Sequence, residues 1–118
     1  PELGIYEGAG GAQLAANFAR GLSGTIPGSE IVDAIVALWT ALEAGDTDRA
    51  YRIAPLVVAL NALGTGLDGY LAIEKHLLVR RGVVPNPAVR GPVAFTLDPD
   101  SRAEADRLFD LLMAEVAR

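Results

Sequence analysis

A strand–loop–helix–strand pattern near the N-terminus constrains the fold of this chain more than any other feature. In the stretch GIYEGAGGAQLAANFARGLSGTIPG, we predict an apolar strand over residues 3–6 and a glycine-rich loop over residues 8–11. Apolar side chains at helical spacing, followed by a glycine, predict a helix over residues 12–20. A second short strand is predicted over residues 23–26, where Pro27 ends it. Two strands joined by a helix must run parallel, and a parallel pair needs cover on both faces, so an α/β fold is expected.

The remainder of the chain is predicted to be almost entirely helical. Apolar residues recur three and four positions apart in four further segments, which are separated by glycines or polar turns. Before the last of them, three prolines and a glycine predict an extended connector instead of a regular element. The predicted helices cover residues 30–44, 46–63, 67–81 and 98–118, and the connector covers residues 83–96.

Three of these helices have recognisable start signals, and the second of them begins with the capping sequence Asp46-Thr47-Asp48. Ser29 is a candidate N-cap for the first helix, and Glu30 places a negative charge in its first turn. Asp98 followed by Pro99 is typical of an N-cap and the first helical position. A capping box within residues 101–104 is the alternative start for the same helix.

The charge balance excludes a nucleic-acid-binding surface, which would show clustered Lys and Arg. The net charge is −5, and the adjacent pair Arg80-Arg81 ends a predicted helix, where cations complement the helix dipole. All apolar runs are interrupted well before the ~20 residues of a membrane span, so no membrane association is expected. The absence of cysteine excludes disulfides and thiol sites, and it fits a cytoplasmic location. Because the sequence opens on Pro1 directly before a strand, we expect it to be part of a longer chain.

Few side chains in this sequence indicate chemistry by themselves. Lys75 and His76 are the only residues of their types. A lone lysine in mid-helix is more often structural or exposed than a nucleophile, and a lone histidine has no neighbour with which to share a metal ion. The loop at residues 8–11 precedes a helix, which would suit an anion, but it lacks both the Walker lysine and the GxGxxG pattern. Neither a metal site nor a nucleotide site is therefore predicted.

The ends of the two strands are the best candidates for a binding site. Parallel sheets place their sites at the C-terminal ends of strands, and glycine allows a ligand to approach the backbone closely. Residues 7–11 and 27–29 both lie at such ends. Glu7 is the one ionisable group there, and two roles stay open for it: a pocket residue, or a helix-cap or salt-bridge residue.

Five segments are familiar by their order and spacing. They are IYEGAGG, FARGLSGTIPG, LEAGDTDRAYRIAPL, AIEKHLLVRRGVV and NPAVRGPVAFTLDPDSRAEADRLFDLL. Together they resemble the C-terminal part of the dihydrodipicolinate synthase / N-acetylneuraminate lyase family over essentially the whole chain. The resemblance implies that residues 1–45 form the last two βα units of a (β/α)8 TIM barrel and that residues 46–118 form a C-terminal helical extension. Since two strands cannot close a barrel, we expect the missing part on a longer chain or on an associating one.

The resemblance also implies an activity. Family members form a Schiff base between a lysine on the sixth strand and pyruvate or another 2-oxo acid, and a tyrosine that a neighbouring subunit helps to organise moves protons. Aldol cleavage, condensation or dehydration follows, without a metal or organic cofactor. Both positions lie upstream of this stretch, so no catalytic residue is expected within it, and Lys75 does not match the nucleophile position. The expected substrate-binding residues are Glu7, Gly8, Gly10, Gly11, Ile26 and Pro27.

Two functions follow from these observations. The first is the C-terminal portion of a Schiff-base-forming (class I) aldolase or lyase that acts on a 2-oxo acid, needs no cofactor and works as a homodimer or homotetramer. The second is a non-catalytic helical module for oligomerisation or regulation. Residues 57–63 and 67–79 favour the second because they are apolar on more than one face, as a helix that packs against a partner would be.

Overall fold

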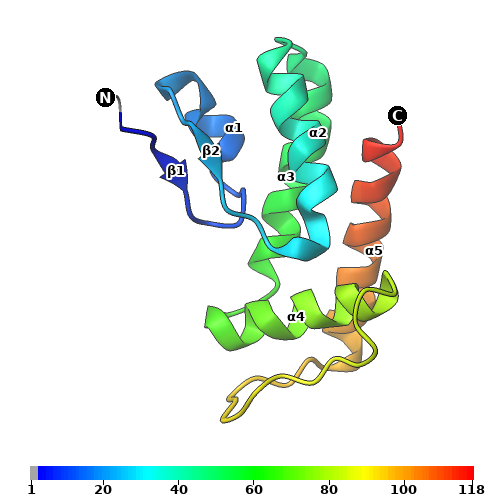
Figure 1. Cartoon of the computed structure of the whole chain (residues 1–118). Coiled ribbons are helices and arrows are strands. Elements are labelled where there is room, and N and C mark those ends of the chain that lie inside the picture. Colours follow the sequence, from blue (N-terminus) through cyan, green and yellow to red (C-terminus); the bar gives the residue numbers. More distant parts are fainter. Residues whose placement is uncertain (1–2) are drawn as a thin grey trace.

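The computed structural model describes residues 3–118 and shows a mostly helical molecule with two short parallel strands (Figure 1). In chain order the elements are β1 (Tyr6–Glu7), α1 (Leu14–Asn17), the 3-10 turn η1 (Phe18–Arg20), β2 (Gly24–Thr25), the 3-10 turn η2 (Ser29–Ile31), α2 (Val32–Glu43), α3 (Thr47–Ala62), α4 (Gly66–Arg80) and α5 (Pro99–Val116). The helices α2 and α3 stand side by side in the centre. The strands and α1 lie on one side of this pair, α5 lies on the other, and α4 crosses one end (Figure 1).

The predicted parallel pairing of the two strands is confirmed, but the regular ladder is shorter than expected. Each strand holds two residues, in place of the four predicted at 3–6 and 23–26. Two more backbone bonds extend the pairing, from the Ser23 N–H to the Ile5 carbonyl (2.8 Å) and from the Ile26 N–H to the Glu7 carbonyl (3.0 Å). The register pairs Tyr6 with Gly24 and Glu7 with Thr25.

Both faces of the strand pair carry exposed apolar side chains. Ile5 and Ile26 keep 64% and 66% of their surface accessible, and Leu3 and Tyr6 are exposed as well. Because side chains alternate along a strand, Ile5 shares a face with Glu7 whereas Ile26 shares the other face with Tyr6, and parallel strands are normally covered on both faces. The described residues contain this one two-stranded sheet and not a barrel.

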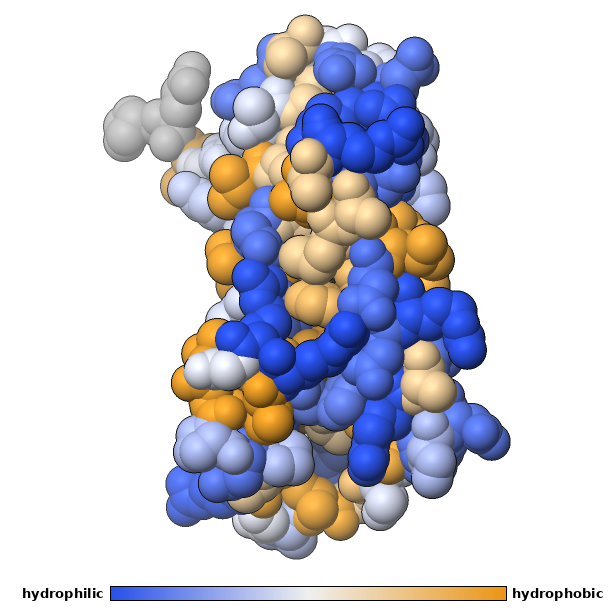
Figure 2. All heavy atoms as spheres, turned by 90° about the vertical axis from the view of Figure 1, so that its right-hand side faces the viewer, coloured by the Kyte–Doolittle hydropathy of each residue, from blue (hydrophilic) through white to orange (hydrophobic). Residues whose placement is uncertain are grey.

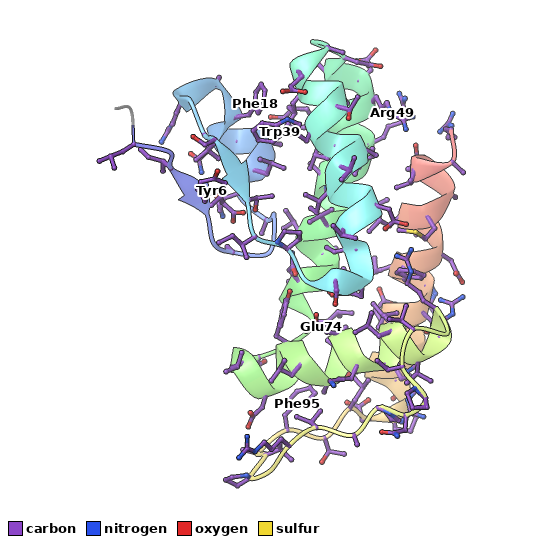
Figure 3. All side chains as sticks on the ribbon, in the orientation of Figure 1. Tyr6, Phe18, Trp39, Arg49, Glu74 and Phe95 are labelled. Atoms are coloured by element: carbon purple, nitrogen blue, oxygen red, sulfur yellow. The ribbon has the colours of Figure 1, made fainter. Side chains whose placement is uncertain are left out.

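The helix predicted at residues 12–20 forms in two parts. The regular helix α1 begins at Leu14, and it changes to the 3-10 turn η1 at Phe18. Gly21 ends the turn in the left-handed region, with φ 90°, as the sequence predicts. Phe18 packs edge-on against Trp39 of α2, with ring centroids 5.1 Å apart (Figure 3). This aromatic contact joins the strand unit to the helices.

A continuous hydrophobic core connects all of the α-helices. Leu14, Leu38, Val57, Leu77 and Leu112 come from five different helices, and each is completely buried. Full burial of a side chain of this size stabilises the fold by about 1.5–3 kcal/mol. The core runs across the predicted boundary at residues 45 and 46, because α2 packs on α3. The division into a barrel part and a helical extension stays a prediction.

The helix starts show which cap predictions hold. The Asp98 side chain accepts a hydrogen bond from the Ser101 N–H (2.9 Å), which confirms Asp98 as the N-cap of α5. In the same way, Asp46 caps α3 by accepting from the Arg49 N–H (3.0 Å). The prediction for Ser29 was wrong: it lies inside η2 and makes no side-chain cap bond there.

The junction between α3 and α4 depends on two glycines. The backbones of Gly64 and Gly69 approach so closely that a Cβ on Gly64 would lie 2.6 Å from the Gly69 carbonyl carbon. The chain bends by 118° at this point. Among the described residues no single helix is long and apolar enough to cross a membrane, and α3 and α4 reach that length and composition only as this bent pair.

The connector between α4 and α5 is extended, as predicted, and runs back along α4 (Figure 1). The Ala94 N–H donates a hydrogen bond to the Asp68 carboxylate (2.8 Å), which holds the connector against the start of α4. Phe95 of the connector and Glu74 lie on opposite sides of α4 (Figure 3). The connector therefore leaves free the side of α4 that faces the strands.

Figure 2 shows the side of the molecule that carries α5. Hydrophilic and hydrophobic side chains alternate across this face. Ion pairs join neighbouring helices, including Arg52 of α3 with Glu115 of α5 (3.2 Å) and Arg80 of α4 with Asp106 of α5 (3.5 Å). Pairs at such partly exposed positions contribute little stability each, so the packing of α5 rests mainly on the core.

Candidate functional site

The carboxylate of Glu7, which is only 8% exposed, organises the loop after β1. Its Oε1 atom accepts hydrogen bonds from the Ala9 N–H (2.8 Å) and the Gln13 N–H (3.3 Å). Its Oε2 atom accepts from the Gly11 N–H (3.0 Å) and from the Thr25 hydroxyl. A buried carboxylate needs such partners, and hydrogen bonds to a charged group are strong. The loop N–H groups that a phosphate would use are thus already engaged by the chain's own anion.

Two glycines give this loop its shape. Gly10 and Gly11 have φ angles of 66° and 89°, in the left-handed region that favours glycine. A Cβ on Gly11 would also collide with the Ile35 side chain of α2. The Gly10 carbonyl accepts a hydrogen bond from the Asn61 amide of α3 (3.1 Å). The loop is therefore fixed both by its own carboxylate and by the helices behind it.

A cavity of about 630 Å³ opens between the strand ends and α4. This volume lies within the usual range of small-molecule sites. Four of the six predicted substrate-binding residues line the cavity, namely Gly8, Gly10, Ile26 and Pro27. The other lining residues are Ala9, Gly28, Asn61, Gly64, Gly66, Leu67, Tyr70 and Glu74.

The remaining two predicted residues, Glu7 and Gly11, do not line the cavity. Both lie behind its wall, where the Gly11 N–H donates to the Glu7 carboxylate. Both roles stay open for Glu7: its carboxylate holds the loop that precedes α1, and no side-chain cap bond is made at the start of that helix. That the cavity binds a substrate stays a prediction.

The wall formed by α4 was missed by sequence reasoning. Tyr70 and Glu74 lie one turn apart on the side of this helix that faces the strand ends, and Figure 3 shows Glu74 there. Glu74 accepts hydrogen bonds from both the N–H and the hydroxyl of Ser29, each at 3.2 Å. The sequence did contain one signal: residues four positions apart in a helix lie on the same face, so Tyr70 and Glu74 could be placed together. Nothing local in the sequence indicated that this face meets the end of β2.

Glu30 lies just behind this wall and is only 3% exposed. Within the part of the chain that the structure describes, its Oε2 atom has no hydrogen-bond partner. Burial raises the pKa of Glu30 to about 7, and the Glu74 carboxylate adds to the shift, whereas the Glu30 backbone and Arg81 oppose it. Burial also raises the pKa of Tyr70 to about 12, again with a contribution from the two carboxylates.

The other ionisable residues singled out in the sequence lie away from the cavity. Neither Lys75 nor His76 lines it, and the His76 Nε2 atom lies 2.8 Å from a carboxylate oxygen of Asp106 in α5. Arg81 donates to both carboxylate oxygens of Asp33, at 2.9 and 2.7 Å, and so joins the end of α4 to α2. Among residues 3–118 no cluster of three or more acidic or histidine side chains is placed to hold a metal ion.

Comparisons with known proteins connect this geometry to a family. No protein-family model matches the sequence, and no curated protein matches it significantly. The structure is similar to the crystal structure of dihydrodipicolinate synthase from Rhodopseudomonas palustris, with a TM-score of 0.81 and 29% sequence identity. The match covers 93% of this chain and 36% of that chain, so this chain spans about a third of that enzyme's length. The resemblance inferred from the five segments is confirmed, and the match fits the C-terminal part of the enzyme.

Proposed function

We propose that this chain, which resembles the C-terminal part of dihydrodipicolinate synthase, is the corresponding portion of a Schiff-base-forming (class I) aldolase or lyase. Its substrate would be pyruvate or a related 2-oxo acid. The observation that carries the proposal is the structural match over 93% of the chain. The match includes a parallel βαβ unit whose two strand ends meet at one cavity, where a barrel enzyme places its site.

The chemistry follows from what a Schiff base does. A lysine amine attacks the 2-oxo carbon, water leaves, and the resulting iminium withdraws electrons from the bond that is made or broken at the adjacent carbon. Lys75 lies outside the cavity, so the proposal assigns the nucleophile to the remaining part of the barrel. The residues of this chain supply a wall: the backbone at Gly8, Ile26 and Pro27, held in place by the bonds to Glu7.

The exposed strand pair supports an assembly with the rest of a barrel. Ile5 on one face and Ile26 on the other are well exposed, and a complete barrel would cover both faces. We propose that the first six βα units, on the same or a second polypeptide, provide this cover. We further propose that the complete enzyme is a cytoplasmic homo-oligomer. Exposed Tyr51 and Val58, which lie on one side of α3, are candidates for the subunit contact.

The alternative function, a non-catalytic helical module, has less support. In the two apolar segments that suggested it, Val57, Leu60, Ile73 and Leu77 are buried within this chain itself, whereas Val58 and Leu67 are exposed. A partner is therefore needed to cover only part of these segments.

Reductive trapping tests the proposed activity. A polypeptide that contains residues 1–118 together with the rest of the barrel is treated with pyruvate and borohydride, digested and analysed by mass spectrometry. We expect a pyruvate adduct on one lysine outside residues 1–118 and none on Lys75. The isolated 118-residue chain under the same conditions is the control, and it should stay unmodified. A folded protein without an adduct, or with its adduct on Lys75, would contradict the proposal.

A further inference from the structure

A second cavity, of about 400 Å³, lies between α4, the connector and the start of α5, and we call it the connector pocket. It lies on the side of α4 that faces Phe95, opposite the side that carries Glu74 (Figure 3). It shares no lining residue with the cavity at the strand ends, and its volume is within the usual range of small-molecule sites. The connector pocket is therefore a separate space that the proposed function does not use.

Most of the wall of the connector pocket is apolar. Ala72 and Val79 line it from α4, and Val93 and Phe95 line it from the connector. The connector is closely packed at one end of the pocket, because a Cβ on Gly69 would lie 3.3 Å from the Phe95 ring. An apolar wall of this kind favours a ligand with a hydrocarbon body.

Arg102 supplies this pocket with a cation that can bind a ligand. It lies one turn before Asp106 on α5, so the two side chains are on the face that meets α4. Asp106 is already engaged by His76 (2.8 Å) and by Arg80 (3.5 Å). None of the ion pairs within residues 3–118 includes Arg102. Its guanidinium can therefore present two N–H groups to a carboxylate from outside the chain.

The pocket's own carboxylate, that of Asp68, lies at the opposite end. Asp68 and His76 are about 12 Å apart along the axis of α4, from the rise of an α-helix. Asp68 also accepts a hydrogen bond from the Ala94 N–H (2.8 Å). Salt screens exposed charges beyond about 8 Å, so Asp68 repels an anion at the Arg102 end only weakly.

We propose that the connector pocket binds a small carboxylic acid with an apolar body, and that Arg102 binds its carboxylate group. A neutral ligand of the same shape would make the apolar contacts but would lack the charge-assisted hydrogen bonds. A cation of the same shape would be repelled by Arg102. The site does not depend on the proposed function, because its walls are α4, the connector and α5 alone.

A titration of the 118-residue chain with three matched probes tests the site. The probes are benzoate, benzamide and benzamidine, which share a phenyl ring and a flat head group and are negative, neutral and positive at pH 7. We expect benzoate to shift the backbone NMR signals of Ala72, Phe95 and Arg102 in a saturable way. Benzamide should bind about fivefold more weakly, which is the upper end of the range for an exposed ion pair, and benzamidine should bind more weakly still.

Three variants separate the cation from the cavity. Arg102→Gln should weaken benzoate binding about fivefold and leave benzamide binding unchanged. Arg107→Gln removes the same charge from an exposed position on α5 that does not line the pocket, and it should change neither affinity. Ala72→Leu fills the pocket without changing the charge, so it should weaken the binding of both probes. The same NMR spectra report whether each variant is folded.

Four outcomes would overturn the proposal. They are the absence of saturable binding up to millimolar benzoate, equal affinities for benzoate and benzamide, equal weakening by Arg102→Gln and Arg107→Gln, and tighter binding of benzamidine than of benzoate. Pyruvate trapping modifies a lysine outside this chain, whereas the probe titration reads residues 68–102. The failure of either test therefore leaves the result of the other intact.

Discussion

Substitution of Glu7 by glutamine is the sharpest test of how the strand unit is built. The carboxylate accepts four hydrogen bonds, two on each oxygen, from three backbone N–H groups and the Thr25 hydroxyl. Glutamine has almost the same shape but only one oxygen. At most two of the four bonds survive, and the new NH₂ group then faces two donors.

The expected loss of stability follows from these contacts. A hydrogen bond to a charged group contributes about 1.5–3 kcal/mol, and a buried donor left without a partner costs a similar amount. Two lost bonds would cost about 3–6 kcal/mol, and water can replace part of this loss at the partly buried Ala9 and Gln13 amides. We therefore expect Glu7→Gln to lower the free energy of unfolding by roughly 3 kcal/mol. This is a large share of the 5–15 kcal/mol typical of a domain, yet it leaves the variant folded.

Urea denaturation followed by circular dichroism measures this change, and amide hydrogen exchange locates it. Exchange at Ala9 and Gly11 should accelerate more in the variant than exchange in α3. Glu43→Gln, at an exposed position, is the matched control and should stay within about 0.5 kcal/mol of the parent. A loss below about 1 kcal/mol, with unchanged exchange at the two loop amides, would refute the reasoning.

Three further predictions concern the helices. The pKa of Glu30 is raised from 4.5 to about 7, so its contribution to stability is fully present below about pH 4.5 and is lost as pH rises through 7. Urea titrations across this pH range should show the free energy of unfolding fall by an amount on the order of 2–3 kcal/mol. The variant Glu30→Gln should not show this fall. Gly64→Ala should cost at least about 2 kcal/mol because its Cβ meets the backbone of α4, whereas Gly8→Ala, with open space around it, should change the thermal midpoint little. Arg81→Lys keeps the charge but loses the two-point contact with Asp33. We expect the free energy of unfolding, measured by urea denaturation, to fall by about 1 kcal/mol, and by less in high salt. An unchanged free energy of unfolding would refute a contribution of this contact to stability.

The sequence predicted those features whose causes are local. The cap at Asp98, the left-handed glycine at Gly21 and the parallel strands each depend on residues only a few positions apart or on the chain's connectivity. The predicted strands were too long because the length of a strand is set by hydrogen bonding to its neighbours as well as by its own residues. Each strand here has a single neighbouring strand within residues 3–118. The order of segments was enough to indicate the family, since spacing survives when individual residues change.

What the sequence could not show are contacts between distant segments. Ser29 has the composition of an N-cap, but its side chain bonds to Glu74, 45 residues away. Glu30 sits in a first turn, where acidic residues are usually solvated, and its burial follows from the packing of η2 against α4. The same packing placed Tyr70 at the cavity. The candidate site was thus predicted on its strand side and missed on its helix side.

The hydrogen bonds to Glu7 also suggest the order in which the parts of this molecule fold. All of its partners lie within eighteen residues of it along the chain. The entropy cost of closing a loop grows with the length of chain enclosed, so contacts of this kind form early. We expect the loop and the two strands to close before α2 docks on them through Trp39 and Phe18. The strand pair is then already formed while the helices are still folding, so the backbone edge with which a neighbouring barrel strand would pair is ready before the rest of the chain has folded.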